Sequence, residues 1–259
     1  MMRGWIGRIC LTVALVGTAS MAQAQVVFDA CTESHTGGTG SASEASFTWN
    51  HDPVGAPRGL IIWTMVLTNS TDLAGTVTYD GTTIPPLTGG AAVDINGEAL
   101  HLKAYFLGSN VPATDPAAVV INRTNNADVM YAVACTVTAG GDTETNGIVL
   151  LQEDQSLAEQ SVDDGSPGTN SVRFAGIASG IGNAPPTVGA ASTLGQEIDI
   201  GGQTASVVRE TTAGQGARSV GWTEAAPDDV AAVHLAIRQV AAAGGVIKQL
   251  LLMGVGPQW

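Results

Sequence analysis

The chain has few positive charges. Its 259 residues include ten lysines and arginines against 23 aspartates and glutamates, and its formal net charge at pH 7 is -13. The only lysines are Lys103 and Lys248. Proteins that bind nucleic acid or an anionic membrane surface need basic side chains to neutralise phosphates. The composition therefore argues against both partners, fits a soluble extracellular protein, and leaves oxygen ligands for divalent cations.

The sequence also lacks the short motifs that mark common catalytic and zinc sites. No H-E-x-x-H or H-x-x-x-H spacing joins any of its four histidines, and no G-x-S-x-G or S-x-x-K segment supports a serine nucleophile. We expect each histidine at the surface: His35, His51, His101 and His234. The acids cluster in loops, where solvated carboxylates are expected, although glycosidase-type pairs are set in space and not by spacing. We expect no enzyme activity and no resident cofactor.

The first 24 residues are typical of a cleaved signal peptide. Arg3 and Arg8 form a short positive segment, residues 9–16 are apolar, and Ala22-Gln23-Ala24 precedes a cut ahead of Gln25. The apolar run is short for a membrane span, and the alternative is an uncleaved anchor or a core strand. We expect a secreted or cell-surface protein without a membrane span in the mature chain. Its net charge would be -15, because the removed segment carries two arginines and no acid.

Two cysteines remain after the predicted cleavage. Cys135 alternates with Val133 and Val137 and should point inward, whereas Cys31 lies close to the mature N-terminus. In an oxidising compartment they can pair and close a loop of roughly 100 residues, which stabilises the fold by about 4 kcal/mol in the chain-entropy model. One buried and one free thiol is the alternative. We favour the disulfide.

The composition and the alternation of apolar residues predict the fold class. Charged residues make up 13% of the chain and hydrophobic residues 44%, a balance typical of an ordered protein. Short alternating runs separated by turn residues recur from Ser46 onwards. They predict an all-β, antiparallel two-sheet sandwich of jelly-roll or Ig-like type with about ten strands. We divide the chain into a signal peptide (1–24), a flexible lead-in (25–45), the sandwich (46–240) and an apolar tail (241–259).

Some runs are more informative than others. Gly59–Thr68 is apolar on both faces, which predicts a strand that is central or covered by a partner. Asp80-Gly81 and Gly201-Gly202-Gln203 each predict a hairpin. Residues 150–161 fit either a short surface helix or an irregular crossing. Residues 230–240 fit both strand and helix spacing, and we choose a strand that closes one edge of a sheet.

The order of elements carries a resemblance. A Val77–Thr82 hairpin is followed by the aromatic-bearing run Ala104–Leu107, the Val-rich run Val119–Ile121, an Ala/Val strand and a late strand with Trp222. Over roughly residues 46–240 this resembles the single-domain β-sandwich surface proteins that are abundant in environmental bacterial and phage genomes. The resemblance implies an extracellular or virion-surface structural or binding role and transfers no functional residue. The signal peptide departs from the usual phage variants and favours a cell-encoded protein.

Two groups of residues are candidates for ligand binding. Asp163 and Asp164, followed by Gly165, are the best candidates for a calcium site, because Ca²⁺ takes six to eight oxygen ligands from flexible acidic loops. Exposed aromatic rings bind glycans, but the chain has only five tryptophans, three tyrosines and four phenylalanines. The candidate rings are Trp49, Tyr105 and Trp222, and their alternative is burial in the core.

The apolar tail is a candidate for assembly. Its large apolar residues are Ile247, Leu250, Leu251, Leu252 and Met253. Since burial of each such side chain is worth about 1.5–3 kcal/mol, the tail should pack on its own sandwich or on a neighbour. The leading hypothesis is a non-enzymatic structural or interaction protein that self-associates through the tail and the 59–68 strand, or binds another surface protein. The second hypothesis is a carbohydrate-binding, lectin-like module, with or without calcium.

Overall fold

The computed structural model describes residues 25–35, 44–66, 74–93, 100–124, 129–152, 157–165, 170–180, 186–200, 203–223 and 229–240. This part of the chain forms 18 strands, with no helix that could cross a membrane, and its strand pairs are antiparallel. The predicted all-β antiparallel class is confirmed. The predicted count of about ten strands is wrong, because several segments without clear alternation also pair as strands. The predicted signal peptide and the apolar tail lie outside the described residues.

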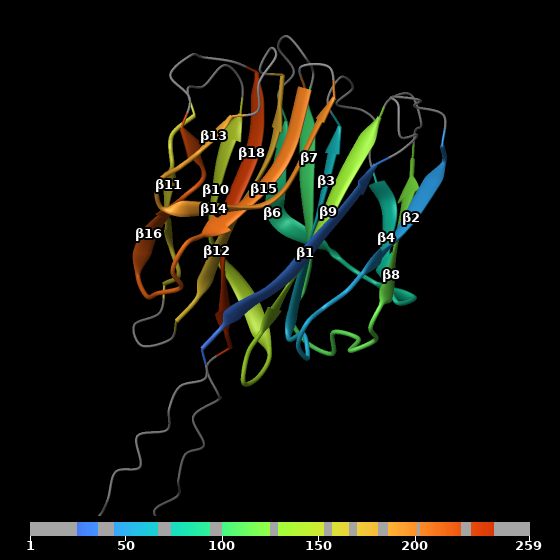
Figure 1. Cartoon of the computed structure of the whole chain (residues 1–259), viewed down its shortest axis with the longest axis horizontal. Helices are drawn as coiled ribbons and strands as arrows, with labels where there is room; N and C mark the ends of the chain where they lie inside the picture. The colour runs from blue at the N-terminus through green and yellow to red at the C-terminus, as the bar shows by residue number, and fades with distance from the viewer. Residues whose placement is uncertain are drawn as a thin grey trace, which may run out of the picture.

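Three sheets make up most of the fold, and Figure 1 shows them side by side. In spatial order, sheet I contains β1 (Val27–His35), β9 (Met130–Thr138), β3 (Gly59–Val66), β7 (His101–Leu107) and β6 (Pro86–Val93). Sheet II contains β10 (Thr143–Gln152), β18 (Val230–Gln239), β12 (Val172–Ser179), β15 (Gln203–Glu210) and β14 (Ser192–Ile200). Sheet III contains β2 (Ser46–His51), β8 (Ala117–Arg123), β4 (Ala74–Tyr79) and β5 (Thr82–Thr83).

Two short strand pairs complete the described fold. They are β11 (Gln160–Asp163) with β16 (Ala217–Val220), and β13 (Thr187–Val188) with β17 (Trp222–Thr223). Their apolar side chains Val162, Val220 and Trp222 join a core on the face of sheet II that is turned away from sheet I. Sheet II is therefore covered on both faces.

Sheet I is also buried on both faces. Ile61, Trp63 and Met65 of β3 pack into the core shared with sheet II, while Leu60 and Ile62 pack into the core shared with sheet III. Every residue of β3 is buried. The prediction of a central strand is confirmed, and the stack has one major layer more than a two-sheet sandwich. The suggested use of this strand for self-association is wrong, because the chain's own sheets cover it.

Close approach of sheets I and II depends on a glycine. A Cβ added at Gly176 of β12 would lie 2.7 Å from the ring of Trp63, which is fully buried. A real side chain would therefore collide with the largest side chain of the core. Gly176 leaves the space that the indole ring fills.

Both predicted hairpins are confirmed. In the first, Tyr79 pairs with Thr82 across a turn in which Asp80 and Gly81 have positive φ angles of 46° and 74°, the pattern of a type I′ turn. In the second, β14 pairs with β15.

The two ambiguous segments are also resolved within the described residues. Residues 230–239 form a strand, as chosen, but β18 lies between β10 and β12 and is not an edge. Nearly all of its side chains are buried, because the strand is covered on both faces. A strand with apolar residues on both faces also contains apolar residues three and four positions apart, which is the spacing of a helix. In the 150–161 segment, the described residues include the end of β10 and the start of β11.

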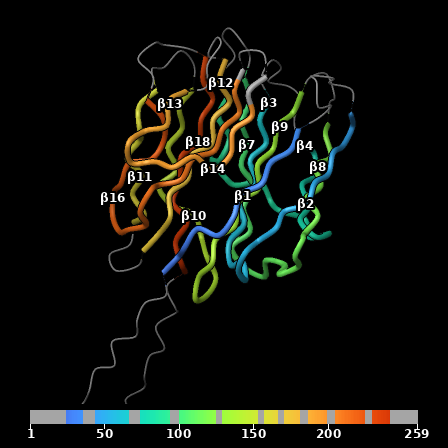
Figure 2. Tube along the Cα trace, viewed as in Figure 1, coloured from blue at the N-terminus to red at the C-terminus, as the bar shows by residue number. Residues whose placement is uncertain are grey.

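The predicted flexible lead-in is wrong for residues 27–35. These residues form β1, which pairs along its length with β9 and is partly buried from Phe28 onwards. Its polar residues Asp29 and Thr32 interrupt the apolar alternation that marks a strand. Their hydrogen-bond partners, Thr136 and His51, come from distant parts of the sequence. Figure 2 shows β1 running obliquely across the molecule.

Candidate functional site

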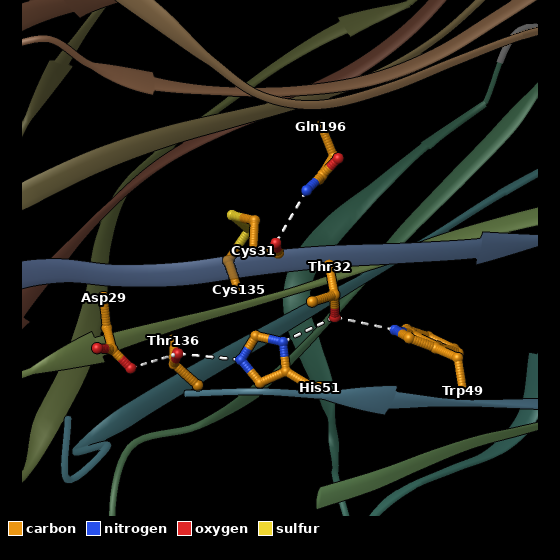
Figure 3. Close-up of a disulfide and its surroundings, with 8 residues drawn as sticks. All are labelled: Asp29, Cys31, Thr32, Trp49, His51, Cys135, Thr136 and Gln196. Atoms are coloured by element: carbon orange, nitrogen blue, oxygen red, sulfur yellow. Dashed lines mark hydrogen bonds between the residues drawn. A yellow bond between two sulfur atoms is a disulfide. The ribbon is translucent and has the colours of Figure 1, made fainter. Parts of the chain in front are cut away.

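The predicted disulfide is present on β1. Cys31 and Cys135 are directly opposite residues of β1 and β9, with their Cα atoms 4.1 Å apart, and they are bonded through their sulfur atoms (Figure 3). Both side chains belong to the core between sheets I and II. The carbonyl oxygen of Cys31 also accepts a hydrogen bond of 2.9 Å from Nε2 of Gln196 on β14. This contact joins the edge of sheet I to the edge of sheet II.

The opposite face of β1 carries a chain of hydrogen bonds to sheet III, shown in Figure 3. Thr136 Oγ1 donates its only proton to Asp29 Oδ2 at 2.9 Å, so it must accept from His51 Nε2 at 3.0 Å. His51 Nδ1 then accepts from Thr32 Oγ1 at 2.8 Å, and Thr32 Oγ1 accepts from Trp49 Nε1 at 3.0 Å. We call these five side chains the β1–β2 chain. Its donors all point one way, from Trp49 to Asp29.

This direction of the β1–β2 chain goes with a neutral imidazole that carries its proton on Nε2. His51 is fully buried, and burial lowers the pKa of its ring, an effect that Asp29 and Asp52 oppose. The expectation of a surface histidine is wrong here, because two threonines on sheet I supply partners for both ring nitrogens. A hydroxyl that donates to a neutral imidazole is also the geometry of an activated nucleophile. Here Trp49 also donates to the hydroxyl of Thr32, and Thr136 lies between the ring and the carboxylate of Asp29. These hydrogen bonds connect sheet I to sheet III.

A second polar cluster joins sheet II to the β11–β16 pair. Arg173 is fully buried, with Nη1 3.1 Å from Oε1 of Glu210 and Nη2 3.4 Å from Oδ2 of Asp164. Glu210 also lies 3.0 Å from Nε of Arg218. Burial raises the pKa of Glu210, and the charge and hydrogen bonds of Arg173 oppose the rise. Two arginines and two acids leave this group, called the Arg173 cluster, with no net charge.

The two predicted calcium residues differ in burial and in their hydrogen-bond partners. Asp164 is fully buried, and its carboxylate accepts from Ser171 Oγ at 2.8 Å and from the amide of Gly216 at 3.1 Å, beside Arg173. Asp163 is exposed and accepts from the amide of Gly165 at 2.9 Å. The guanidinium of Arg173 therefore lies against the carboxylate of Asp164. Within the described ranges no three His, Cys, Asp or Glu side chains converge as metal ligands.

The candidate aromatic residues are separated by the fold. Tyr105 and Trp222 are buried in two different cores, and the hydroxyl of Tyr105 donates to the carbonyl oxygen of Ala74 at 3.1 Å. Their placement as a glycan-binding surface is therefore wrong, because apolar neighbours cover both rings. Trp49 is half-buried and stacks on Phe47 with ring centroids 5.9 Å apart. The tail residues Ile247, Leu250, Leu251, Leu252 and Met253 lie outside the described residues.

Two further histidines are buried, contrary to expectation. Burial lowers the pKa of both His101 and His234 to about 4, with Lys103 as a second cause at His101. The ring of His234 lies edge-on to Trp222, with centroids 6.2 Å apart, because β18 is covered on both faces. Both are therefore neutral at pH 7.

Comparison with known proteins identifies no relative, since no family model, curated protein or solved structure matches the chain.

We predict that acid destabilises the protein through its buried histidines. Because the pKa of each ring is lower in the folded protein, the unfolded chain binds the proton first. The stability that the neutral rings contribute is therefore fully present above pH 6.5 and is lost as the pH falls towards about 4. In urea titrations at about pH 7 and about pH 4.5, His234→Leu should lose about 2 kcal/mol less stability than the native protein. An equal loss in both proteins would contradict this assignment.

We predict that Thr32→Val destabilises the protein by about 1–3 kcal/mol, because it leaves Trp49 Nε1 without its acceptor and His51 without its donor. Thr48→Val, at an exposed position of β2, is the matched control and should change stability by less than about 0.5 kcal/mol. Urea unfolding followed by tryptophan fluorescence measures both variants. Equal stability of the two variants would show that the β1–β2 chain contributes little.

Proposed function

We propose that this chain is a secreted or surface-exposed, non-enzymatic structural or interaction protein. The observation that carries the proposal is the disulfide between Cys31 and Cys135, whose partners are 104 positions apart in sequence. Structural disulfides persist in oxidising compartments and are rare in the cytosol. The signal-peptide pattern of residues 1–24 supports the same location.

The described polar interior supports a structural role. The side chains of the β1–β2 chain bind one another, and those of the Arg173 cluster form mutual ion pairs. Groups engaged in this way hold the sheets together, and proton transfer would leave an imidazolium buried in the core. A scaffold tied at several points suits a protein that works by presenting a surface.

Self-association through the apolar tail is part of the proposal. Since β3 is covered by sheets II and III, we propose the apolar segment Val246–Met253 for contact with another copy. Its composition favours addition to a neighbouring sheet edge, the mode in which an extended segment pairs with an exposed strand.

Light scattering on the purified exported protein tests the assembly. We expect the native protein to form at least a dimer, whereas deletion of residues 245–259 yields a monomer. In the full chain, Leu250→Ser with Leu252→Ser should weaken association in the same direction. Val54→Ser, which removes a valine that is 87% exposed outside the tail, is the matched control and should have no effect. A strict monomer that the deletion leaves unchanged would contradict the proposed assembly.

A further inference from the structure

A pocket of about 280 Å³ lies where β1 meets β15, at the end of the core between sheets I and II. Its walls include Phe28, Val172, Arg209, Glu210, Thr211 and Thr212. The volume is just below the usual range of about 300–1,000 Å³ for small-molecule sites, which are largely apolar with a few polar groups that orient the ligand, so it suits a small ligand. All of these residues belong to the described part of the chain.

The notable feature of the pocket is the charge of Arg209. Its guanidinium lies over the ring of Phe28, 4.2 Å from the centroid, and one of its N–H groups donates to the carbonyl oxygen of Glu210 at 3.3 Å. Partial burial lowers its pKa, because removal from water disfavours the charged form. Among the described residues no carboxylate lies within ion-pair distance of Arg209, whereas Arg173, Arg218 and Arg238 each have an acidic partner.

The acid that shares the pocket does not compensate this charge. Glu210 is almost fully buried and directs its carboxylate at Arg173 and Arg218, at 3.1 and 3.0 Å. The Arg173 cluster is neutral as a whole, so Arg209 gives the pocket a net positive charge. In a protein with a formal charge of -13, this is a local reversal of sign.

The remaining walls restrict the class of ligand. The guanidinium keeps N–H donors in a planar fork, which matches the two oxygens of a carboxylate. Half-buried Phe28 offers apolar surface for a carbon skeleton, and the exposed Thr211 and Thr212 offer hydroxyls at the rim. An inorganic anion would leave the apolar walls uncovered. We propose that this pocket binds the carboxylate of a hydroxylated ring acid of monosaccharide size, the class to which uronic acids belong, with Arg209 as the residue that selects the charge.

The test is a titration of the purified protein with D-galacturonate and with D-galactose as the neutral counterpart, monitored by amide chemical shifts. We expect galacturonate at about 10 mM, a concentration that would nearly saturate a site with a Kd of about 1 mM, to shift the amides of Phe28, Thr211 and Thr212. Galactose should bind at least about tenfold more weakly, because it lacks the charge that Arg209 pairs.

Two arginine variants make the test specific. Arg209→Gln should weaken galacturonate binding at least about tenfold, whereas Arg58→Gln should leave it unchanged. Each variant removes one positive charge, but Arg58 is exposed and lies outside the pocket walls. A difference between the two variants therefore reports the position of the charge in the pocket. Thr212→Val, at an exposed rim position, should weaken galacturonate binding a few-fold. This variant replaces Arg209→Gln in the test if Arg209→Gln does not fold.

Three results would overturn the proposal. They are no shift at these amides in the native protein, equal affinity for galactose, and equal weakening by Arg58→Gln and Arg209→Gln. Gln25, the predicted first residue of the mature chain, also lines the pocket, so the titration uses the mature protein. A failed titration would leave the proposed export and assembly untouched.

Discussion

Burial of both faces of sheet I determines where the other sheets lie. Strand β3 has apolar residues on both of its faces. A single partner sheet would leave one of these faces in water, whereas full burial of each Leu or Ile is worth about 1.5–3 kcal/mol. Sheet II covers one face and sheet III covers the other. Sheet II in turn has a second apolar face, which the two short strand pairs cover. The layered order seen in Figure 1 follows from strands that are apolar on both sides.

The edge strand β1 fastens these layers to one another. It is bonded covalently to β9 within sheet I, it accepts a hydrogen bond from β14 of sheet II, and its threonine binds His51 of sheet III. Apolar contacts between sheets are non-directional, whereas the β1–β2 chain needs each donor opposite its acceptor. The polar contacts therefore specify how the sheets are aligned, and the apolar cores supply most of the stability. At the same strand, Phe28 supports the guanidinium of Arg209, so the proposed ligand pocket depends on the position of β1 as well.

Much of the fold was predictable from local patterns, and much of the site was not. The two hairpins, the buried strand β3 and the disulfide follow from short-range signals, namely turn residues, alternation and the count of cysteines. The burial of His51 and Arg173 depends on partners far away in the chain, Thr136 and Glu210, and nothing in their own neighbourhood indicates it. For the same reason β1, with its polar residues, resembled a flexible lead-in. Arg173 shares its strand face with the apolar Ala175 and Ile177, and a charged residue on an otherwise apolar face is the signal that could have indicated a buried ion pair.

The proposed function depends on export into an oxidising compartment, where the bond between β1 and β9 forms. Intact mass and N-terminal sequencing of the protein recovered from the producing cells and their medium test this most directly. We predict that the protein is found outside the cytoplasm, begins at Gln25, and is two hydrogen atoms lighter than the reduced chain because Cys31 and Cys135 are bonded. A cytoplasmic protein that retains residues 1–24 and carries both thiols free would contradict the account.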